Sequence, residues 1–297
     1  MVQDLFDEDM FADEPPPELP RREPRRRSGG GAARGETARR ILFALPWIAF
    51  AIAIAIVGGI VFALAMIAIG LLCLREYFLM TAPLRPFQLV AYIAVAAMVL
   101  AAYFGSAFNV LLLGTASFAL LFLFGARRQG RGGIVVSMGV TVLGAAWIGL
   151  PLVHAVLLRD LPNHGAALLV DVLVGTFATD TGAYATGRMF GSHKITPNLS
   201  PNKTLEGLIG GFLIGTMAFW FAGLYQNWLS GADALIIGAA VAAIAPIGDL
   251  FASMVKRDLG AKDTGKLFGP HGGLLDRLDA VLFTIVVGYY LAVQLVY

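Results

Sequence analysis

The chain has 297 residues, 58% of them hydrophobic and only 14% charged, with a mean hydropathy of +0.74 and a formal net charge of +2. Soluble globular domains carry about 45–50% apolar and about 25% charged residues, so this composition excludes an ordinary soluble domain and indicates a membrane protein. Cys73 is the single cysteine, which excludes disulfides within the chain and cysteine-based metal sites.

The first 40 residues differ in composition from the rest of the chain. An acidic stretch from Asp4 to Glu18 is followed by eight arginines between Arg21 and Arg40, with proline-rich and glycine-rich segments among them. Such a segment cannot bury a hydrophobic core, so residues 1–40 are predicted to be a disordered, acidic-then-basic tail in the cytoplasm. Its arginines either fix the topology or attract anionic lipid.

Apolar runs long enough to span a membrane begin at Ile41. Residues 41–74 as one helix would be about 51 Å long, against a hydrocarbon core of about 30 Å, so we expect a break at Gly58-Gly59. The predicted spans are residues 41–57, 60–79, 87–104, 107–125, 133–158, 164–187, 205–229, 234–255 and 278–297. The predicted fold class is therefore all-α, a polytopic helical integral membrane protein with about nine transmembrane helices. Glycine and proline make 133–158 the least regular span.

Lysines and arginines indicate how the spans are oriented. With a cytoplasmic N-terminus and alternating spans, every lysine and arginine except Arg159 falls on the cytoplasmic side. The C-terminus then lies outside, and the two polar loops, 188–204 and 256–277, face the cytoplasm. A wrong number of spans would scatter the basic residues over both sides, so their distribution supports both the count and the orientation.

Polar side chains gather around the junction of the last two predicted spans. Four of them follow the spacing i, i+4, i+7 and i+8, which puts them on one face at the end of a helix: Asp249, Ser253, Lys256 and Arg257. Asp276 and Asp279, at i and i+3, share a face at the start of the last span. Carboxylates from two helix ends, without cysteine ligands, suit a hard cation such as Mg²⁺.

A glycine-rich loop joins these two helix ends and carries Lys262, Asp263, Lys266 and His271. Glycines let the backbone approach a ligand closely, and the free N–H groups of a helix N-terminus favour phosphate. Basic side chains around a metal site are the requirement for phosphoryl or nucleotidyl transfer, in which positioning and charge neutralisation do most of the catalysis.

Each part of this cluster also has a purely structural interpretation. Asp249 can be a buried ion-pair partner of Lys256 or Arg257, and the Asp276-Arg277-Asp279 segment can cap or anchor its helix at the interface. The loop lysines can be topology determinants, and the histidine an ordinary loop residue. Taken as a unit the cluster favours function, because acids at membrane depth are costly.

A second polar stretch supports the functional interpretation. Asp180, Tyr184 and Arg188 are spaced i, i+4 and i+8 along a helix that leaves the membrane on the same side. The turn that follows carries Lys203, and Thr204 is expected to cap the next helix.

Two further acids are less clear. Glu206 has a capping role or a catalytic one. Asp171 lies deep in its span without a partner nearby in the sequence, and it receives no role.

The C-terminal cluster forms a long run of fixed positions: Ser253, Lys256, Arg257, Lys262, Asp263, Gly265, Phe268, Gly269, His271, Gly272, Gly273, Asp276, Arg277 and Asp279. This run resembles the signature of the phosphatidate cytidylyltransferases, also called CDP-diacylglycerol synthases. The segments "DTGAY..GR.FG..K" and "SP.KTLEG" resemble a second block of that family, and "LREYF" at 74–78 looks like its E-[FY]-[FY] feature. The resemblance covers residues 41–297.

The resemblance implies that CTP and phosphatidic acid react to give CDP-diacylglycerol and pyrophosphate, with Mg²⁺ as the cofactor. It implies Asp249 and Asp276 as metal ligands, and Asp279 either as a further ligand or as a residue that orients Arg277. The implied catalytic residues are Asp249, Asp276, Asp279, Lys262 and Asp263. The implied substrate-binding residues are Ser253, Lys256, Arg257, His271, Arg277, Lys203, Asp180 and Arg188.

The same resemblance sets the expected organisation and surroundings. Residues 41–297 would be a transmembrane cytidylyltransferase domain, with N-terminal helices at 41–160 and catalytic helices and cytoplasmic loops at 161–297. The expected location is a bacterial-type inner membrane, with membrane lipid around the protein, the active site on the cytoplasmic side, no nucleic-acid partner and a homodimer left open. The alternatives are a CTP-dependent lipid kinase of the polyprenol or phytol type and, in another class, a membrane transporter.

Overall fold

Helices account for nearly all of the chain that the structure describes. The structure, a computed structural model, describes residues 50–128, 132–197, 199–265, 267 and 272–297, and the predicted tail at 1–40 lies outside them. Residues 50–57 are helical, and the elements that follow are α2 (Gly59–Met80), the 3-10 turn η3 (Ala82–Leu84), α3 (Gln88–Phe104), α4 (Ala107–Arg127), α5 (Ile134–Gly144), the π-helical turn η4 (Ala145–Gly149), α6 (Leu150–Arg159), α7 (Gly165–Phe190), β1 (Lys194–Thr196), β2 (Ser200–Thr204), α8 (Leu205–Gly223), α9 (Gly231–Asp258) and α10 (Leu275–Leu295).

Most of these helices can cross a bilayer. Within the described ranges, seven helices are long and apolar enough to do so, with the continuous run Ile134–Arg159 counted as one of them. α3 is apolar but has only 17 residues, and the first predicted span, 41–57, is described only from residue 50. The protein is thus an all-α polytopic membrane protein, while the count of nine spans and the orientation stay predictions.

The predicted break between the first two spans is present. Gly58 and Gly59 have φ values of +64° and +56°, which glycine adopts without strain. Arg159, the one basic residue predicted to lie outside, donates to the carbonyl oxygens of Ala55 and Ile56 at 2.5 and 3.2 Å. A cation at these carbonyls satisfies the end of the 50–57 helix and opposes its dipole.

The span predicted at 133–158 is a helix with an irregular centre. α5 and α6 are joined by the π-helical turn η4, and Pro151 is the second residue of α6. Proline lacks a backbone N–H, so the helix cannot keep a regular hydrogen-bond ladder through this turn.

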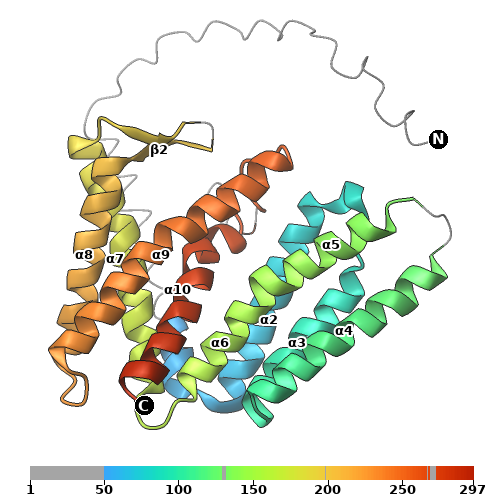
Figure 1. The fold of residues 1–297 in the computed structure, drawn as a ribbon, viewed down its shortest axis with the longest axis horizontal. Coiled ribbons are helices and arrows are strands. Elements are labelled where there is room, and N and C mark those ends of the chain that lie inside the picture. The colour runs from blue at the N-terminus through green and yellow to red at the C-terminus, as the bar shows by residue number, and fades with distance from the viewer. Residues whose placement is uncertain (1–49, 129–131, 198, 266, 268–271) are drawn as a thin grey trace, which may run out of the picture. The chain divides into compact units, whose positions relative to one another are not determined.

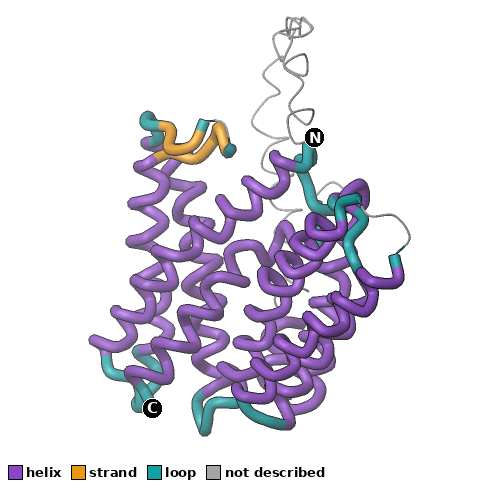
Figure 2. The backbone as a smooth tube through the Cα atoms, turned by 45° about the vertical axis from the view of Figure 1, so that its right-hand side comes forward, coloured by secondary structure: helices purple, strands orange, loops and turns teal. Residues whose placement is uncertain are grey.

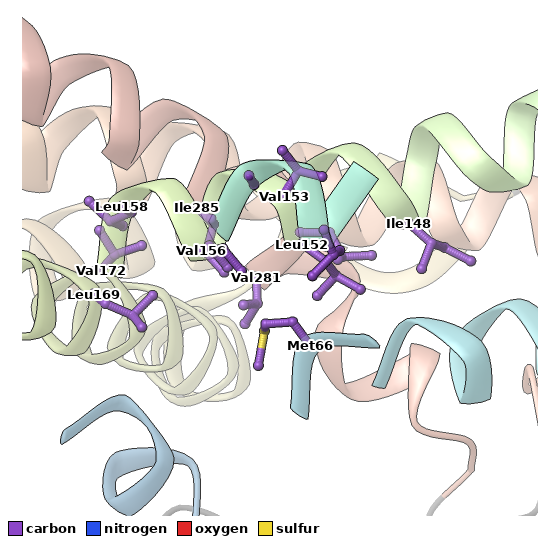
Figure 3. Packing of buried hydrophobic residues seen from close by; sticks show 14 of the residues in the cluster. Met66, Ile148, Leu152, Val153, Val156, Leu158, Leu169, Val172, Val281 and Ile285 are labelled. Atoms are coloured by element: carbon purple, nitrogen blue, oxygen red, sulfur yellow. The ribbon is translucent and has the colours of Figure 1, made fainter. Parts of the chain in front are cut away.

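The core joins helices that are far apart in sequence. Figure 3 shows Met66 of α2 beside Val281 of α10, and both belong to one buried cluster with Val156 of α6 and Val172 of α7. Figure 1 shows α7 to α10 on one side of the helical unit and α2 to α6 on the other. α6 packs against α10, which connects the two groups.

Small residues bring α7 and α8 together. Gly207, Gly211 and Gly215 follow one another at four-residue intervals on α8, facing α7. A Cβ added at Gly211 would lie 2.7 Å from the Thr179 carbonyl oxygen, so the two backbones approach more closely than any side chain would allow. Close contact between small residues is how membrane helices gain packing energy, because lipid removes the hydrophobic drive between them.

The polar ends of the C-terminal helices lie together. The β1–β2 hairpin, the C-terminal end of α9 and the N-terminal end of α10 are at the same end of the helical unit, and the C-terminus of the chain is at the opposite end (Figures 1 and 2). The spans predicted at 234–255 and 278–297 are too short at this end, because α9 continues to Asp258 and α10 begins at Leu275. Lys256, Arg257 and Asp276 therefore lie inside regular helix.

Candidate active site

A short hairpin brings Lys203 to α9. β1 and β2 pair antiparallel, with Lys194 opposite Thr204 and Thr196 opposite Ser200. The Lys203 Nζ lies 2.8 Å from Asp249 Oδ2, and both side chains are partly exposed. Sequence reasoning offered Lys256 or Arg257 as the ion-pair partner of Asp249; the structure gives it Lys203 instead.

Two side chains hold the hairpin at the start of α8. The Thr204 hydroxyl accepts from Gly207 N at 3.2 Å, as predicted for a helix cap. The Glu206 carboxylate accepts from Ser192 N at 3.0 Å and from His193 Nδ1 at 2.6 Å. The contacts of Glu206 are those of a residue that fixes the loop before the hairpin.

Further carboxylates converge on Asp249. Asp180 of α7 interacts electrostatically with both Asp249 and Lys203, and Asp279 of α10 interacts with Asp249, Lys256 and Asp180. α9 and α10 approach each other closely here, since a Cβ added at Gly248 would lie 2.5 Å from the Asp279 carbonyl oxygen. The negative charges of three acids from three helices therefore act on one another. The positive charges of Lys203 and Lys256 partly offset this repulsion.

Asp276 occupies a separate and well-ordered arrangement. Its Oδ1 lies 2.7 Å from Lys256 Nζ, and both side chains are only 11% exposed. Its Oδ2 accepts from Thr264 N at 2.8 Å, from Thr264 Oγ1 at 3.0 Å and from Gly273 N at 2.9 Å. Charge-assisted hydrogen bonds of this kind fix a carboxylate firmly.

Glu76 of α2 also reaches this arrangement, and sequence reasoning missed its role. Glu76 is 7% exposed, its carboxylate accepts from Leu274 N and Leu275 N, and its Oε2 lies 3.1 Å from Thr264 Oγ1, whose single proton it shares with Asp276 Oδ2. In the sequence, Glu76 stands out only as part of the "LREYF" segment that resembles the family's E-[FY]-[FY] feature. Its one usable signal was an acid within an apolar helix, without any indication of a partner almost 200 residues away.

The remaining predicted residues lie around these pairs rather than within them. Ser253 is a half-buried neighbour of Asp249, with its hydroxyl 3.5 Å from Oδ1. Arg188 donates to Tyr184 at 2.9 Å, which confirms their shared helix face, and Arg257 donates to the Ala261 carbonyl at 3.2 Å. Five of the predicted positions in this group are exposed: Arg188, Arg257, Lys262, Asp263 and Arg277. His271 and Lys266 lie outside the described residues.

Asp171 lies apart from this site and has a partner of its own. Its carboxylate is 2% exposed and accepts from Gln226 Nε2 at 2.7 Å. Gln226 belongs to the connection between α8 and α9, so this hydrogen bond ties that connection to α7.

The described carboxylates do not form a closed metal cage. In the part of the chain that the structure describes, no group of three or more His, Cys, Asp or Glu side chains is arranged to hold a metal ion. Mg²⁺ in phosphoryl-transfer sites commonly takes one or two protein carboxylates and completes its octahedron with water and substrate phosphate. The acids near Asp249 fit that pattern.

Comparison of the sequence with known protein families identifies the family to which this chain belongs. The sequence matches the model of the cytidylyltransferase family over residues 38–295. The chain belongs to the cytidylyltransferase family, a family of nucleotidyltransferase enzymes.

Individual relatives are similar over shorter stretches. The uncharacterized protein YnbB of Escherichia coli (strain K12) is 36% identical over 207 residues, 63% of this chain and 68% of that protein. The phosphatidate cytidylyltransferase of Mycobacterium leprae is 38% identical over 149 residues, 50% of this chain and 47% of its own. That of Thermotoga maritima is 43% identical over 136 residues, 43% of this chain and 49% of its own. The chain spans about half the length of these two phosphatidate cytidylyltransferases.

Proposed function

We propose that this protein transfers the cytidylyl group of CTP to phosphatidic acid, giving CDP-diacylglycerol and pyrophosphate. The observation that carries the proposal is the pair of lysine–carboxylate contacts at one end of the bundle, Lys203 with Asp249 and Lys256 with Asp276. The names of several family members, phosphatidate cytidylyltransferase, supply the substrate class.

The chemistry needs this combination of charges. A phosphate oxygen of the lipid attacks the α-phosphorus of CTP, and pyrophosphate leaves. The attacking oxygen is already anionic, so no protein nucleophile is required. The barrier comes mainly from bringing two highly charged anions together, which basic side chains and a cation can offset.

Lys203 and Lys256 suit the role of phosphate ligands. Each holds its ammonium group against a carboxylate, so each is already directed toward the region where the acids converge. The Lys256 side chain is only 11% exposed, and a buried ammonium interacts with phosphate more strongly than one in water. Ser253, Arg257, Lys262, Asp263, His271, Arg277, Asp180 and Arg188 remain proposed contributors.

Mg²⁺ is the proposed cofactor, with Asp249 and Asp276 as its ligands and Asp279 as the third acid beside Asp249. Bound Mg²⁺ would neutralise phosphate charge and orient the triphosphate. Asp276 has both oxygens engaged by hydrogen-bond donors, so Lys256 must release Oδ1 for this carboxylate to bind a cation. Asp249 has fewer contacts in the described residues and needs only to release Lys203.

The proposed setting is the inner membrane of a bacterium, with the site on the cytoplasmic side where CTP is available. The distribution of lysine and arginine supports this orientation. A rim position also suits a lipid substrate, whose phosphate lies at the bilayer surface while its acyl chains stay in the hydrocarbon region.

The test is an assay of detergent-purified protein with CTP, Mg²⁺ and phosphatidic acid in mixed micelles. We expect pyrophosphate to be released in equal amount to CDP-lipid, and only when all three components are present. Release of CDP together with a phosphorylated lipid would instead identify a lipid kinase. Substrate uptake into vesicles without any consumption of CTP would identify a transporter.

A further inference from the structure

Glu76 lies where a carboxylate is costly. It belongs to the last turns of α2, between the buried residues Leu74, Tyr77 and Phe78, and it is itself 7% exposed. Burying an ionised carboxylate is strongly unfavourable unless hydrogen bonds or charges compensate for the lost water. The compensation comes from residues about 190 to 200 positions further along the chain.

The Glu76 carboxylate caps α10 from another helix. Leu274 N donates to Oε1 at 2.9 Å, and Leu275 N donates to Oε2 at 2.9 Å. Leu274 occupies the cap position of α10 and provides no side-chain cap of its own. Free N–H groups and the positive end of the helix dipole at this point favour an acid, so Glu76 supplies what the local sequence lacks.

Thr264 links Glu76 to Asp276. Its hydroxyl oxygen lies 3.1 Å from Glu76 Oε2 and 3.0 Å from Asp276 Oδ2. The backbone N–H of Thr264 also donates to Asp276. Thr264 is 3% exposed, so the contact that links the two carboxylates is buried.

Two glycines of the loop lie directly against the Glu76 carboxylate. A Cβ added at Gly265 would lie 2.7 Å from Glu76 Oε1, and one added at Gly273 would overlap Oε2. The glycines at these two positions are therefore required by contact with Glu76, and they do not face open space where a ligand could lie. Gly272 differs from these two glycines. It has a φ of +85°, and its neighbour is the carboxylate of Asp276 instead of that of Glu76.

We propose that Glu76 is a positioning residue, which holds Thr264 against the N-terminal end of α10 and thereby orients Asp276 through Thr264. In this role it touches neither substrate nor metal. The catalytic consequence rests on the proposed function. If Asp276 is misplaced, the protein should need higher concentrations of CTP and Mg²⁺ to reach half its maximal rate. Loop order itself is independent of which substrate the protein uses.

The first arm of the test measures loop order by hydrogen–deuterium exchange of the purified, substrate-free protein. Glu76→Gln keeps the side-chain shape but replaces one acceptor oxygen with an NH₂ group that faces N–H donors. We expect amide exchange around residues 273–275 to rise at least about tenfold. Asp171→Asn is the matched control, because Asp171 is an equally buried acid with a side-chain partner elsewhere, and exchange at 273–275 should not change.

The second arm measures steady-state kinetics. Glu76→Gln should raise KM for CTP and the Mg²⁺ concentration for half-maximal rate by about tenfold or more. Thr264→Val should do the same without disturbing α2, while Thr264→Ser, which keeps the hydroxyl, should restore near-normal values. Because Glu76 and Thr264 act through one contact, the double variant Glu76→Gln/Thr264→Val should be little worse than the more severe single variant.

Unchanged exchange at 273–275 in Glu76→Gln would overturn the positioning role, whatever the protein's substrate. Raised exchange with unaltered KM values and Mg²⁺ dependence would overturn its link to Asp276. If Glu76→Gln cannot be purified folded, the comparison of Thr264→Val with Thr264→Ser decides: equal kinetics of the two variants would refute the link. If wild-type protein uses another substrate, the exchange arm still decides the loop contact and only the proposed function fails.

Discussion

The proposed chemistry depends on single residues at one end of the helical unit. The two lysine–carboxylate pairs there can be tested separately. The carboxylates of Asp249 and Asp276 come from α9 and α10 and pair with lysines from β2 and α9. Helix periodicity was enough to place each acid on a helix face near the membrane surface. It could not tell which lysine each acid would meet, because Lys203 arrives from a hairpin 46 positions away from Asp249.

Asp249→Asn and Asp276→Asn should each lower CTP-dependent turnover by about 100-fold or more while the protein still inserts into the membrane. The neutral amide removes a negative charge that the proposed cation needs, and metal stabilisation of phosphate charge contributes several kcal/mol. Asp233→Asn is the control, since Asp233 lies in the first turn of α9, at the end away from the site. Near-normal turnover of either site variant at saturating Mg²⁺ would rule out that residue as a metal ligand.

Lys203→Gln should reduce kcat/KM for CTP by about tenfold, corresponding to roughly 1.4 kcal/mol of transition-state stabilisation. The ammonium group that neutralises Asp249, and that is proposed to hold phosphate, is lost. Lys194→Gln removes a charge from the same hairpin at an exposed position and should stay within about twofold of wild type. Equal losses in both variants would mean that only the general positive charge of the hairpin matters.

At the scale of elements, the packing of α7 against α8 sets the position of the hairpin. The hairpin joins the ends of these two helices, so their spacing determines where Lys203 lies over α9. The sequence predicted both helices from their apolar length, and it predicted the cap at Thr204 from its position before an apolar run. The distance and angle at which the two helices pack could not be predicted. Glycines at four-residue spacing mark a possible close contact but do not tell which helix lies against them.

Gly211→Ala should destabilise the protein by about 1–3 kcal/mol, seen as a lower midpoint of thermal unfolding in detergent. The added methyl group would overlap the Thr179 carbonyl and the Ala183 side chain, and overpacking of this kind forces backbones apart. Gly139→Ala is the matched control, because a Cβ there meets nothing within 4 Å and alanine favours helix. A midpoint for Gly211→Ala equal to that of Gly139→Ala would show that α7 and α8 do not need this close approach.

For the whole molecule, composition and basic-residue distribution predicted an all-α membrane protein with its polar loops on one side. The fold class is confirmed, and the β1–β2 hairpin and the facing ends of α9 and α10 lie at one end of the helices (Figures 1 and 2). The link between the N-terminal helices and the site, made by Glu76 on α2, could not be predicted. Two of its three partners are backbone N–H groups, which leave no trace in the side-chain pattern, and the third is the hydroxyl of Thr264, 188 positions away.

The predicted orientation can be tested by labelling. In a Cys73→Ala background, a cysteine at Asp258 should be protected from a membrane-impermeant thiol reagent in intact cells, and a cysteine at Tyr297 should be labelled. Position 258 ends α9 beside the site, whereas 297 follows α10 at the other end. Labelling at 258 with protection at 297 would reverse the topology and would move the site to the outer face.

The reaction itself is tested most directly by following two labelled forms of CTP with the purified wild-type protein, phosphatidic acid and Mg²⁺. Cytidylyl transfer retains the α-phosphorus in the lipid product, so label at the α-position should appear in CDP-diacylglycerol and label at the γ-position only in pyrophosphate. Recovery of γ-label in the lipid, with α-label left in CDP, would contradict cytidylyl transfer and identify phosphoryl transfer instead.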